Sequence, residues 1–425
     1  MQNNHHAHRL LSWIVVLVGG LFFFYEFIQM NMLDAISQAL IQSLHINAAQ
    51  LGQMSSYYFL ANVLFLLVAG TLLDRYSTRL VMLIALGICV LGTAFFSMAH
   101  SFLFVSICRF LTGIGSAFCF LSVLRLASRW FPPKRMALVT GIIVTMAMTG
   151  GAVAQTPFEK LVTIYGWRET LQIDAAFGVC VWLLIACIVR NYPDSHHDKH
   201  VDEQQTLSAI GYVHSLKIAF LRCQNWFCAF YACLMNLPIN VLGGLWGILY
   251  LTTTHDFSKM DASYVTSMLF IGTIFGSPLM GWLSDRMGRR KPLMIAGSII
   301  SISLMILVLH SNLLNLHLLI LLFFAIGFFS STQIISYPLV AESSPRIVTA
   351  MSVSVVSIVT MSGIGIIQNL YGYLLQLHAE SRLHMATTHY VASDFHWAMM
   401  IFLVGYLLAL GGSLLVKESY CLQRE

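Results

Sequence analysis

Long apolar stretches alternate with short polar segments along the whole chain. Polar residues collect in the gaps, and the stretches themselves carry almost no charge. A bilayer core takes about 20 residues of helix, so each stretch predicts one membrane-spanning helix. None shows the alternating pattern of a barrel strand of about 10 residues. The predicted helices are 10–33, 50–73, 79–99, 102–124, 136–158, 167–190, 225–250, 263–284, 293–311, 316–340, 350–373 and 396–416.

Composition excludes a soluble fold of this length. Hydrophobic residues make up 58% of the chain, only 10% of residues are charged, and the mean hydropathy is +0.76. A soluble domain of 425 residues carries more charge and less apolar surface. The predicted fold class is therefore an all-α polytopic membrane protein with 12 transmembrane helices.

The basic residues predict an orientation. With the N-terminus placed in the cytoplasm, 18 Lys and Arg residues fall on the inside and four on the outside. Because inside loops are enriched in Lys and Arg, this bias predicts that both termini are cytoplasmic. The net charge of +5 is thus a topology signal, and no nucleic-acid partner is expected. We expect a multi-pass protein of the bacterial inner membrane, a monomer in contact with lipid.

A short charged segment occurs twice, once in each half. Residues 70–79 read GTLLDRYSTR and residues 281–291 read GWLSDRMGRRK, an offset of 211. An offset of 212 relates Gly115 to Gly327, Pro133 to Pro345 and Gly151 to Gly363. The near-constant offset of 211–212 predicts two parallel six-helix units related by an axis along the membrane normal, with the substrate site between them near the midplane.

One long polar stretch divides the two units. The predicted domains are an N-terminal bundle at 1–190, a cytoplasmic linker at 191–224 and a C-terminal bundle at 225–425. Three linker histidines, His196, His197 and His200, are either a metal site or part of a solvated segment, and the solvated segment is favoured. No metal or other cofactor is expected.

The repeated segment resembles the loops after helices 2 and 8 of the major facilitator superfamily of transporters. Arg109, Gly113 and Gly115 are similar to that superfamily's Arg-x-x-x-Gly-x-Gly motif in helix 4. The resemblance implies a latch that holds the cytoplasmic side in the outward-facing state; topology control by the arginines alone is the alternative. The implied latch residues are Gly70, Asp74, Arg75, Arg79, Gly281, Asp285, Arg286, Gly288, Arg289 and Arg290. Ser77 and Thr78 depart from the motif, which predicts a weaker first latch.

Three ionisable residues lie well inside predicted helices: Glu26, Arg109 and Asp174. Each is seven residues from the outer end of its run, so all three lie about 10 Å below the outer surface. Isolated charge in hydrocarbon costs several kcal/mol and therefore marks functional candidates. We hypothesise that Glu26 pairs with Arg109 and carries a proton; the alternative is a permanent ion pair that only packs helices. Asp174 is a weaker candidate because helix 6 is peripheral in the superfamily.

Uncharged polar residues gather in the helices that the resemblance places around the substrate. This set is rich in amides and poor in fixed charge, which favours a small polar or zwitterionic solute. Glu26 and Arg109 are an alternative pair for the ammonium and carboxylate of an amino acid. Hydrogen bonding between helices is the competing role for the set. The predicted substrate-binding residues are Gln29, Gln155, Asn236, Asn240, Trp246, Gln333, Tyr337, Gln368 and Asn369.

The predicted function is secondary active transport of a small polar solute, an amino acid or similar nutrient, by proton-coupled uptake. Residues 150–157 lack the Gly-Pro-x-x-Gly-Gly element of the superfamily's drug–proton antiporters, which favours uptake over the alternative of efflux of a drug, metabolite or siderophore. The chain is also similar to phagosomal nutrient transporters of intracellular bacteria. An alternative of another class is a receptor that binds solute without moving it. Neither a phosphate-binding loop nor a His-Glu-x-x-His motif occurs, so an enzyme is not expected.

Overall fold

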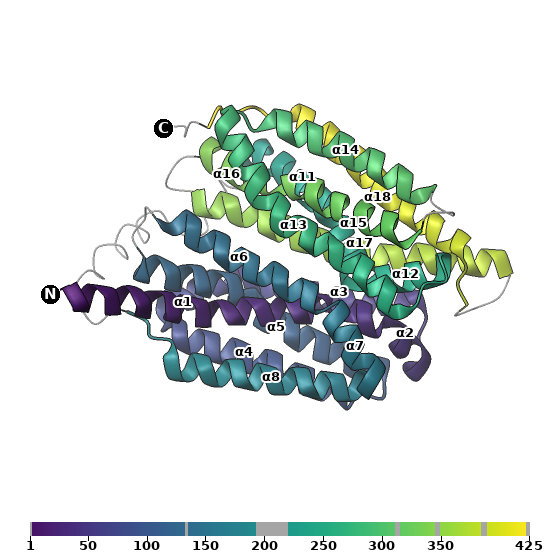
Figure 1. Cartoon of the computed structure of the whole chain (residues 1–425), viewed down its shortest axis with the longest axis horizontal. Helices are drawn as coiled ribbons and strands as arrows, with labels where there is room; N and C mark the ends of the chain where they lie inside the picture. Colours follow the sequence, from purple (N-terminus) through teal and green to yellow (C-terminus); the bar gives the residue numbers. More distant parts are fainter. Residues whose placement is uncertain are drawn as a thin grey trace. The chain divides into compact units, whose positions relative to one another are not determined.

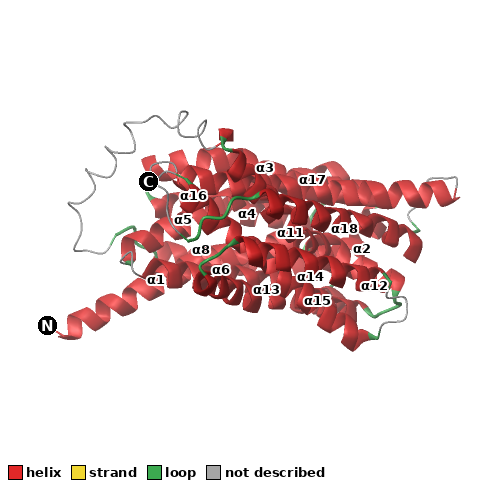
Figure 2. Ribbon diagram, turned by 90° about the horizontal axis from the view of Figure 1, so that it is seen from above, coloured by secondary structure: helices red, strands yellow, loops and turns green. Residues whose placement is uncertain are grey.

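The computed structural model describes residues 2–131, 135–192, 220–310, 315–344, 349–383 and 389–421. These residues form helices and connecting loops, and no strand occurs among them (Figure 2). The chain divides into two compact units, the first made of residues 1–44 and 54–199 and the second of residues 45–53 and 200–425. The predicted all-α class is confirmed. The linker histidines lie outside the described residues.

The first unit contains the N-terminal helices, coloured purple to teal in Figure 1. Helix α3 starts within residues 45–53, which group with the second unit, and continues into the first. The helices are α1 (Gln2–Asn31), α2 (Leu33–Leu44), α3 (Ala48–Arg75), α4 (Thr78–Ser97), α5 (Phe102–Trp130), α6 (Met136–Val153), α7 (Thr156–Tyr165) and α8 (Trp167–Ile188).

The second unit contains the C-terminal helices, coloured teal to yellow. They are α11 (Cys223–Val241), the π-helix η2 (Leu242–Trp246), α12 (Gly247–Thr254), α13 (Lys259–Met287), α14 (Lys291–Leu309), α15 (Leu316–Ser330), the 3₁₀ helix η3 (Ser331–Ile335), α16 (Ser336–Ser343), α17 (Thr349–Leu383) and α18 (Ala392–Leu415).

Each of the twelve predicted runs overlaps a helix, or a series of short helices, of the structure. Eleven spans among the described residues are long and apolar enough to cross a membrane, and α3 corresponds to the remaining predicted run at 50–73. Four runs are interrupted, the first of them at Met32 between α1 and α2. Pro157 lies in the first turn of α7, Pro238 precedes the π-helix η2, and η3 separates α15 from α16. Proline removes a backbone donor, which accounts for the break before Pro157, whereas α11 continues as an α-helix through Pro238.

The same helix pairs pack inside each unit. Helix α4 packs against α5 and α8, while α14 packs against α15 and α18; α1 packs against α6, as α11 packs against α17. Small residues permit the closest approaches: Gly113 of α5 faces the Tyr58 carbonyl of α3, and Gly327 of α15 faces the Leu269 carbonyl of α13. In a lipid environment glycine contacts of this kind allow tight helix packing. The repeated pairing agrees with the duplication predicted from the sequence.

Candidate functional site: a buried polar cluster

Five helices of the first unit bring seven polar side chains together, and we call this set the buried polar cluster. Helix α1 contributes two residues three positions apart, which places them on the same face. All seven side chains are at most 8% exposed. The members are Glu26 and Gln29 of α1, Tyr58 of α3, Thr93 of α4, Arg109 and Ser116 of α5, and Asp174 of α8.

Gln29 is the centre of one half of the buried polar cluster. Its amide nitrogen donates to Asp174 Oδ2, and its amide oxygen accepts a 2.7 Å hydrogen bond from the Thr93 hydroxyl. Its backbone carbonyl accepts a 2.7 Å bond from Arg109 Nη1. The side chain predicted to contact substrate is thus bonded at both ends to the protein. Asp174, predicted to be peripheral, is only 5% exposed and belongs to the cluster.

Tyr58 is the centre of the other half. Its hydroxyl lies 2.7 Å from Ser116 Oγ and 3.4 Å from Glu26 Oε2, and its single proton can be donated to only one of them at a time. Asn62 donates a 2.8 Å bond to the same Ser116 hydroxyl. The Arg109 guanidinium carbon lies 4.6 Å from the centre of the Tyr58 ring, a cation–π contact.

The direct ion pair predicted between Glu26 and Arg109 is not formed. Within the described ranges, Arg109 contacts the Gln29 carbonyl and the Tyr58 ring, and Tyr58 in turn reaches Glu26. The prediction failed here because the sequence gave no sign that an aromatic ring on α3 would stand between the two groups. Among the described atoms, Glu26 Oε1 and Arg109 Nε and Nη2 have no hydrogen-bond partner.

The glycines of the α5 motif make room for this arrangement. Gly113 brings α5 against α3 at the Tyr58 carbonyl. A Cβ on Gly115 would lie 2.6 Å from the Ala85 carbonyl oxygen of α4 and 3.3 Å from Glu26 Oε1. Both positions therefore require the smallest residue, and Gly115 leaves room for the Glu26 carboxyl beside α5.

In the second unit, several predicted substrate-binding residues are bonded to their own unit. Gln368 donates a 2.7 Å bond to the Asn240 carbonyl, next to the π-helix η2, and Asn240 donates to the Asn236 carbonyl. Trp246 lies 5.4 Å from the Tyr371 ring. Gln333 lies in η3, and its Oε1 has no partner among the described atoms.

The other predicted substrate residues differ in burial. Gln155 is fully buried at the break between α6 and α7. Tyr337 of α16 and Asn369 of α17 are half-buried. Hydrogen bonds join three of the predicted residues of the second unit, Gln368, Asn240 and Asn236, to one another.

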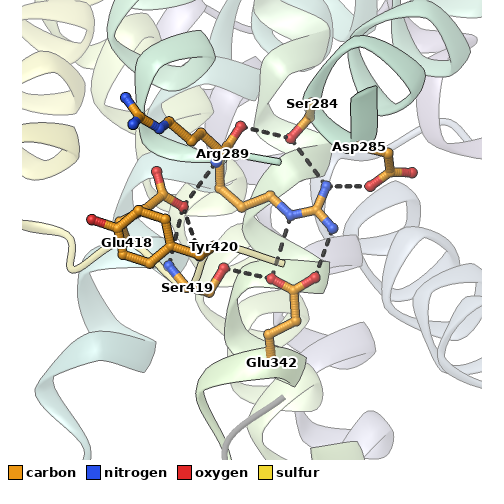
Figure 3. Close-up of polar contacts among 8 residues, drawn as sticks. Ser284, Asp285, Arg289, Glu342, Glu418, Ser419 and Tyr420 are labelled. Carbon is orange, nitrogen blue, oxygen red and sulfur yellow. Dashed lines mark hydrogen bonds and ion pairs between the residues drawn. The ribbon is translucent and has the colours of Figure 1, made fainter. Parts of the chain in front are cut away.

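The second copy of the charged segment lies in a polar group that we call the Arg290 cluster (Figure 3). The Arg290 guanidinium is 2.6 Å from Asp285 Oδ1 and 2.6 Å from Glu342 Oε1, and it donates to Ser284 at 3.0 Å. The side chain of Arg290 is 6% exposed, that of Glu342 15% and that of Asp285 68%. Gly288 ends α13 with a φ of 62°, a left-handed conformation that glycine adopts readily.

Residues after α18 complete the Arg290 cluster. Glu418 accepts bonds from the backbone N–H groups of Arg290 at 2.9 Å and Lys291 at 2.8 Å, where α14 begins. Ser419 donates to Glu342 at 2.5 Å (Figure 3). The N-cap residue of α14 is Arg290, and its side chain makes no hydrogen bond to the first turn of the helix. The Glu418 carboxylate therefore caps this helix end.

These contacts shift the ionisation of the charged groups in the Arg290 cluster. Burial raises the pKa of the Glu418 carboxyl, but hydrogen bonds from four backbone N–H groups outweigh it and leave that pKa below its usual value. Burial lowers the pKa of Arg290, and its bonds to Glu342 and Asp285 outweigh this, so its pKa is raised. Arg290 and Glu418 are therefore charged near neutral pH.

The first copy of the segment is built differently. Ser77 caps α4 by accepting a 3.1 Å bond from the Leu80 N–H. Arg79 donates to the Ala186 carbonyl, and its backbone N–H bonds to Asn191 Oδ1 at 2.9 Å. The side chain of Asp74 is outside the described part of the chain. Ser77, which departs from the motif, thus serves as a helix cap.

Sequence reasoning missed several residues of both clusters. Tyr58, Thr93 and Ser116 are ordinary residues within apolar runs, and only the packing of helices brings them to the charged groups. Glu342 lies just after the run 316–340, as Asp74 lies just after 50–73, and this position was an available signal. Within the described residues, no group of three His, Cys, Asp or Glu side chains could hold a metal ion.

Comparisons with known proteins agree with this architecture. The family model described as Major Facilitator Superfamily matches residues 16–368. The bacterial homologue of the human lysosomal transporter Spinster, in its inward-facing and unoccupied conformation, superposes with a TM-score of 0.77 at 19% identity, covering 96% of this chain and 97% of that one. At this identity the likeness concerns the fold.

Curated relatives are similar over about two thirds of their length. The lysosomal dipeptide transporter MFSD1 of Danio rerio is 25% identical over 67% of this chain and 64% of its own. The probable sulfoacetate transporter SauU of Cupriavidus necator is 24% identical over 65% and 66%. A probable hexose phosphate transport protein of Chlamydia pneumoniae is 24% identical over 68% of both chains.

Proposed function

Since the chain belongs to the major facilitator superfamily, we propose that it carries a small polar solute across the bacterial inner membrane by alternating access, with proton-coupled uptake. The moving parts are the bundles at 1–190 and 225–425, joined by the linker at 191–224. The protein acts as a monomer with both termini in the cytoplasm, an orientation supported by the 18 to 4 distribution of basic residues.

The observation that carries the proton-coupling proposal is the buried polar cluster. It contains two carboxyl groups, Glu26 and Asp174, and one guanidinium, Arg109, all within the apolar part of the first unit. The net charge of the cluster is one negative charge when all three groups are ionised, and it is zero when one of the two carboxyl groups is protonated. Because net charge in hydrocarbon is costly, the resting cluster holds one proton.

We assign that proton to Glu26. Asp174 accepts a hydrogen bond from the Gln29 amide, whereas Glu26 is contacted by Tyr58 at 3.4 Å and by the Cys89 thiol, a weak donor, and its Oε1 is unpartnered among the described atoms. A carboxylate whose donors are long or weak is the more costly one to bury ionised. Release of the proton from Glu26 would change the charge of the cluster and so favour a different arrangement of α1 and α5.

The relatives support a small polar solute as cargo. Dipeptides, sulfoacetate and hexose phosphates, the solutes printed in their names, are all small, polar and carry an anionic group. The second unit is expected to contribute Asn236, Asn240, Trp246, Gln333, Tyr337, Gln368 and Asn369, and the first unit Gln155.

Reconstituted liposomes test this function. With a pH-sensitive dye inside, the wild-type protein is expected to acidify the interior when a transported solute is added outside. Glu26→Gln is expected to bind solute and exchange it without proton flux, because it keeps the shape of the side chain without a titratable proton. Glu380→Gln, which changes a carboxyl outside the buried polar cluster, is the control. Unchanged proton flux in Glu26→Gln would reject the assignment. Solute binding without any flux would instead favour a receptor.

A further inference from the structure

The Arg109 guanidinium has one nitrogen that is hydrogen-bonded and two that have no hydrogen-bond partner among the described atoms. Its Nη1 donates to the Gln29 carbonyl at 2.7 Å, and its face lies over the Tyr58 ring. Its Nε and Nη2 have no partner among the described atoms, although the side chain is 0% exposed. These two nitrogens form the side-on edge of the guanidinium, which is the edge that holds the two oxygens of a carboxylate in parallel.

The protein's own carboxyls do not fill this edge. Asp174 is bonded to Gln29, and Glu26 lies beyond the Tyr58 hydroxyl with its Oε1 also unpartnered within the described part of the chain. A buried guanidinium with two nitrogens that make no hydrogen bond is rare in folded proteins, because buried polar groups are almost always hydrogen-bonded. An edge that is left open in this way fits a ligand that arrives from outside the protein.

We propose that the Nε–Nη2 edge of Arg109 binds the carboxylate of the transported solute. This inference rests on the proposed transport function and narrows its substrate class to small carboxylates. Both oxygens of the solute's carboxylate accept from Arg109, and Tyr58 and the Gln29 carbonyl hold the guanidinium in place.

This binding mode couples the bound carboxylate of the solute to the proton on Glu26. A carboxylate on Arg109 adds one negative charge to a cluster that is neutral with one proton, so the net charge stays at one negative charge only while Glu26 keeps its proton. Loss of that proton places an unpaired negative charge near the bound carboxylate and favours its release. One proton therefore moves with one carboxylate.

Matched pairs of ligands test the proposal on the wild-type protein. The probes are lactate, gluconate, alanine and alanyl-alanine, each compared with its primary amide, and the readout is the apparent melting temperature of the purified full-length protein. At least one carboxylate is expected to raise this temperature in a concentration-dependent way, and its amide is not. Equal stabilisation by carboxylate and amide, or by no member of the panel, would overturn the proposal.

Two substitutions at Arg109 distinguish the role of its Nε–Nη2 edge from that of its positive charge. Arg109→Lys keeps a cation without the two-pronged edge, and we expect its affinity for the stabilising carboxylate to fall by about 10- to 100-fold, the loss typical of one charged hydrogen bond. Arg109→Gln is expected to lose binding. Arg125→Gln, on the same helix but outside the buried polar cluster, is the control. Size-exclusion profiles identify variants that do not fold, and the ligand pairs on the wild-type protein decide the question in that case.

The results distinguish the two proposals. Carboxylate-specific binding that depends on Arg109, with no flux in liposomes, would retain the carboxylate site and reject transport. Proton-coupled flux of an uncharged solute that is unaffected by Arg109→Lys would retain transport and reject the carboxylate site.

Discussion

From the contacts of the Arg290 cluster we predict that Glu342 contributes more to the stability of the second unit than the motif residue Asp285 does. Glu342 accepts from both Nε and Nη2 of Arg290, at 3.4 and 2.6 Å, and also accepts from Ser419. Its side chain is 15% exposed, whereas that of Asp285 is 68% exposed. Solvent screens an exposed pair far more than a buried one. The two substitutions Glu342→Gln and Asp285→Asn each remove one charge and are a matched pair.

The expected magnitudes follow from this difference in burial. Removing one partner of a fully buried pair costs about 3–5 kcal/mol. Arg290 keeps Asp285 and Ser284 in Glu342→Gln, so we expect a loss of about 2 kcal/mol. Asp285→Asn should cost about 0–1 kcal/mol, as exposed pairs do. For a unit of this size the larger loss corresponds to a fall of about 4–8 °C in the apparent melting temperature.

The assay is thermal unfolding of the purified variants in one detergent, at low and high salt. Glu342→Gln is expected to melt well below the wild type at both salt concentrations, because its pair is shielded from ions. Asp285→Asn is expected to differ from the wild type by little at low salt and by less at high salt. A larger loss in Asp285→Asn than in Glu342→Gln would refute the reasoning from burial.

Two further predictions concern other parts of the protein. The pKa of Glu418 is lowered in the folded state by its backbone donors, so its contribution to stability is complete above the ordinary value of about 4.3 and is lost as the pH falls through the folded-state value. The apparent melting temperature of the wild type should thus fall more steeply below about pH 4.5 than that of Glu418→Gln, and parallel curves would contradict the cap. Gly115→Val places a branched side chain against the Ala85 carbonyl and Glu26, so overpacking should cost about 1–3 kcal/mol and reduce solute binding. The control Gly411→Val, where a Cβ meets nothing within 4 Å, should bind as the wild type does.

Hydropathy predicted the positions of the helices but not their full lengths. The run 350–373 corresponds to α17, which extends from Thr349 to Leu383, and the run 102–124 corresponds to α5, which continues to Trp130. Hydropathy registers only the apolar part of a helix, whereas backbone hydrogen bonds continue into polar sequence. The π-helix η2 and the 3₁₀ helix η3 have no hydropathy signal, although Pro238 marked the region of the first.

The sequence predicted only the charged residues of the candidate site as a group. Glu26, Arg109 and Asp174 were conspicuous because they interrupt apolar runs, and the structure places all three in one cluster. Their actual partners, Tyr58 and Gln29, were not predictable as partners, because a tyrosine or glutamine within a membrane helix has many uses. The role of Glu418 was equally hidden, since its bonds go to backbone N–H groups that carry no sequence identity.

The cap on α14 has a consequence for how the protein is made. The Lys291 N–H and the Glu418 carboxyl that accepts from it are 127 residues apart. At a synthesis rate of about 5–20 residues per second, Glu418 leaves the ribosome roughly 6–25 s after the start of α14. Helix α14 therefore enters the bilayer with its first amides still open to water. The bond between Glu418 and this helix end can form only after α18 has been synthesised.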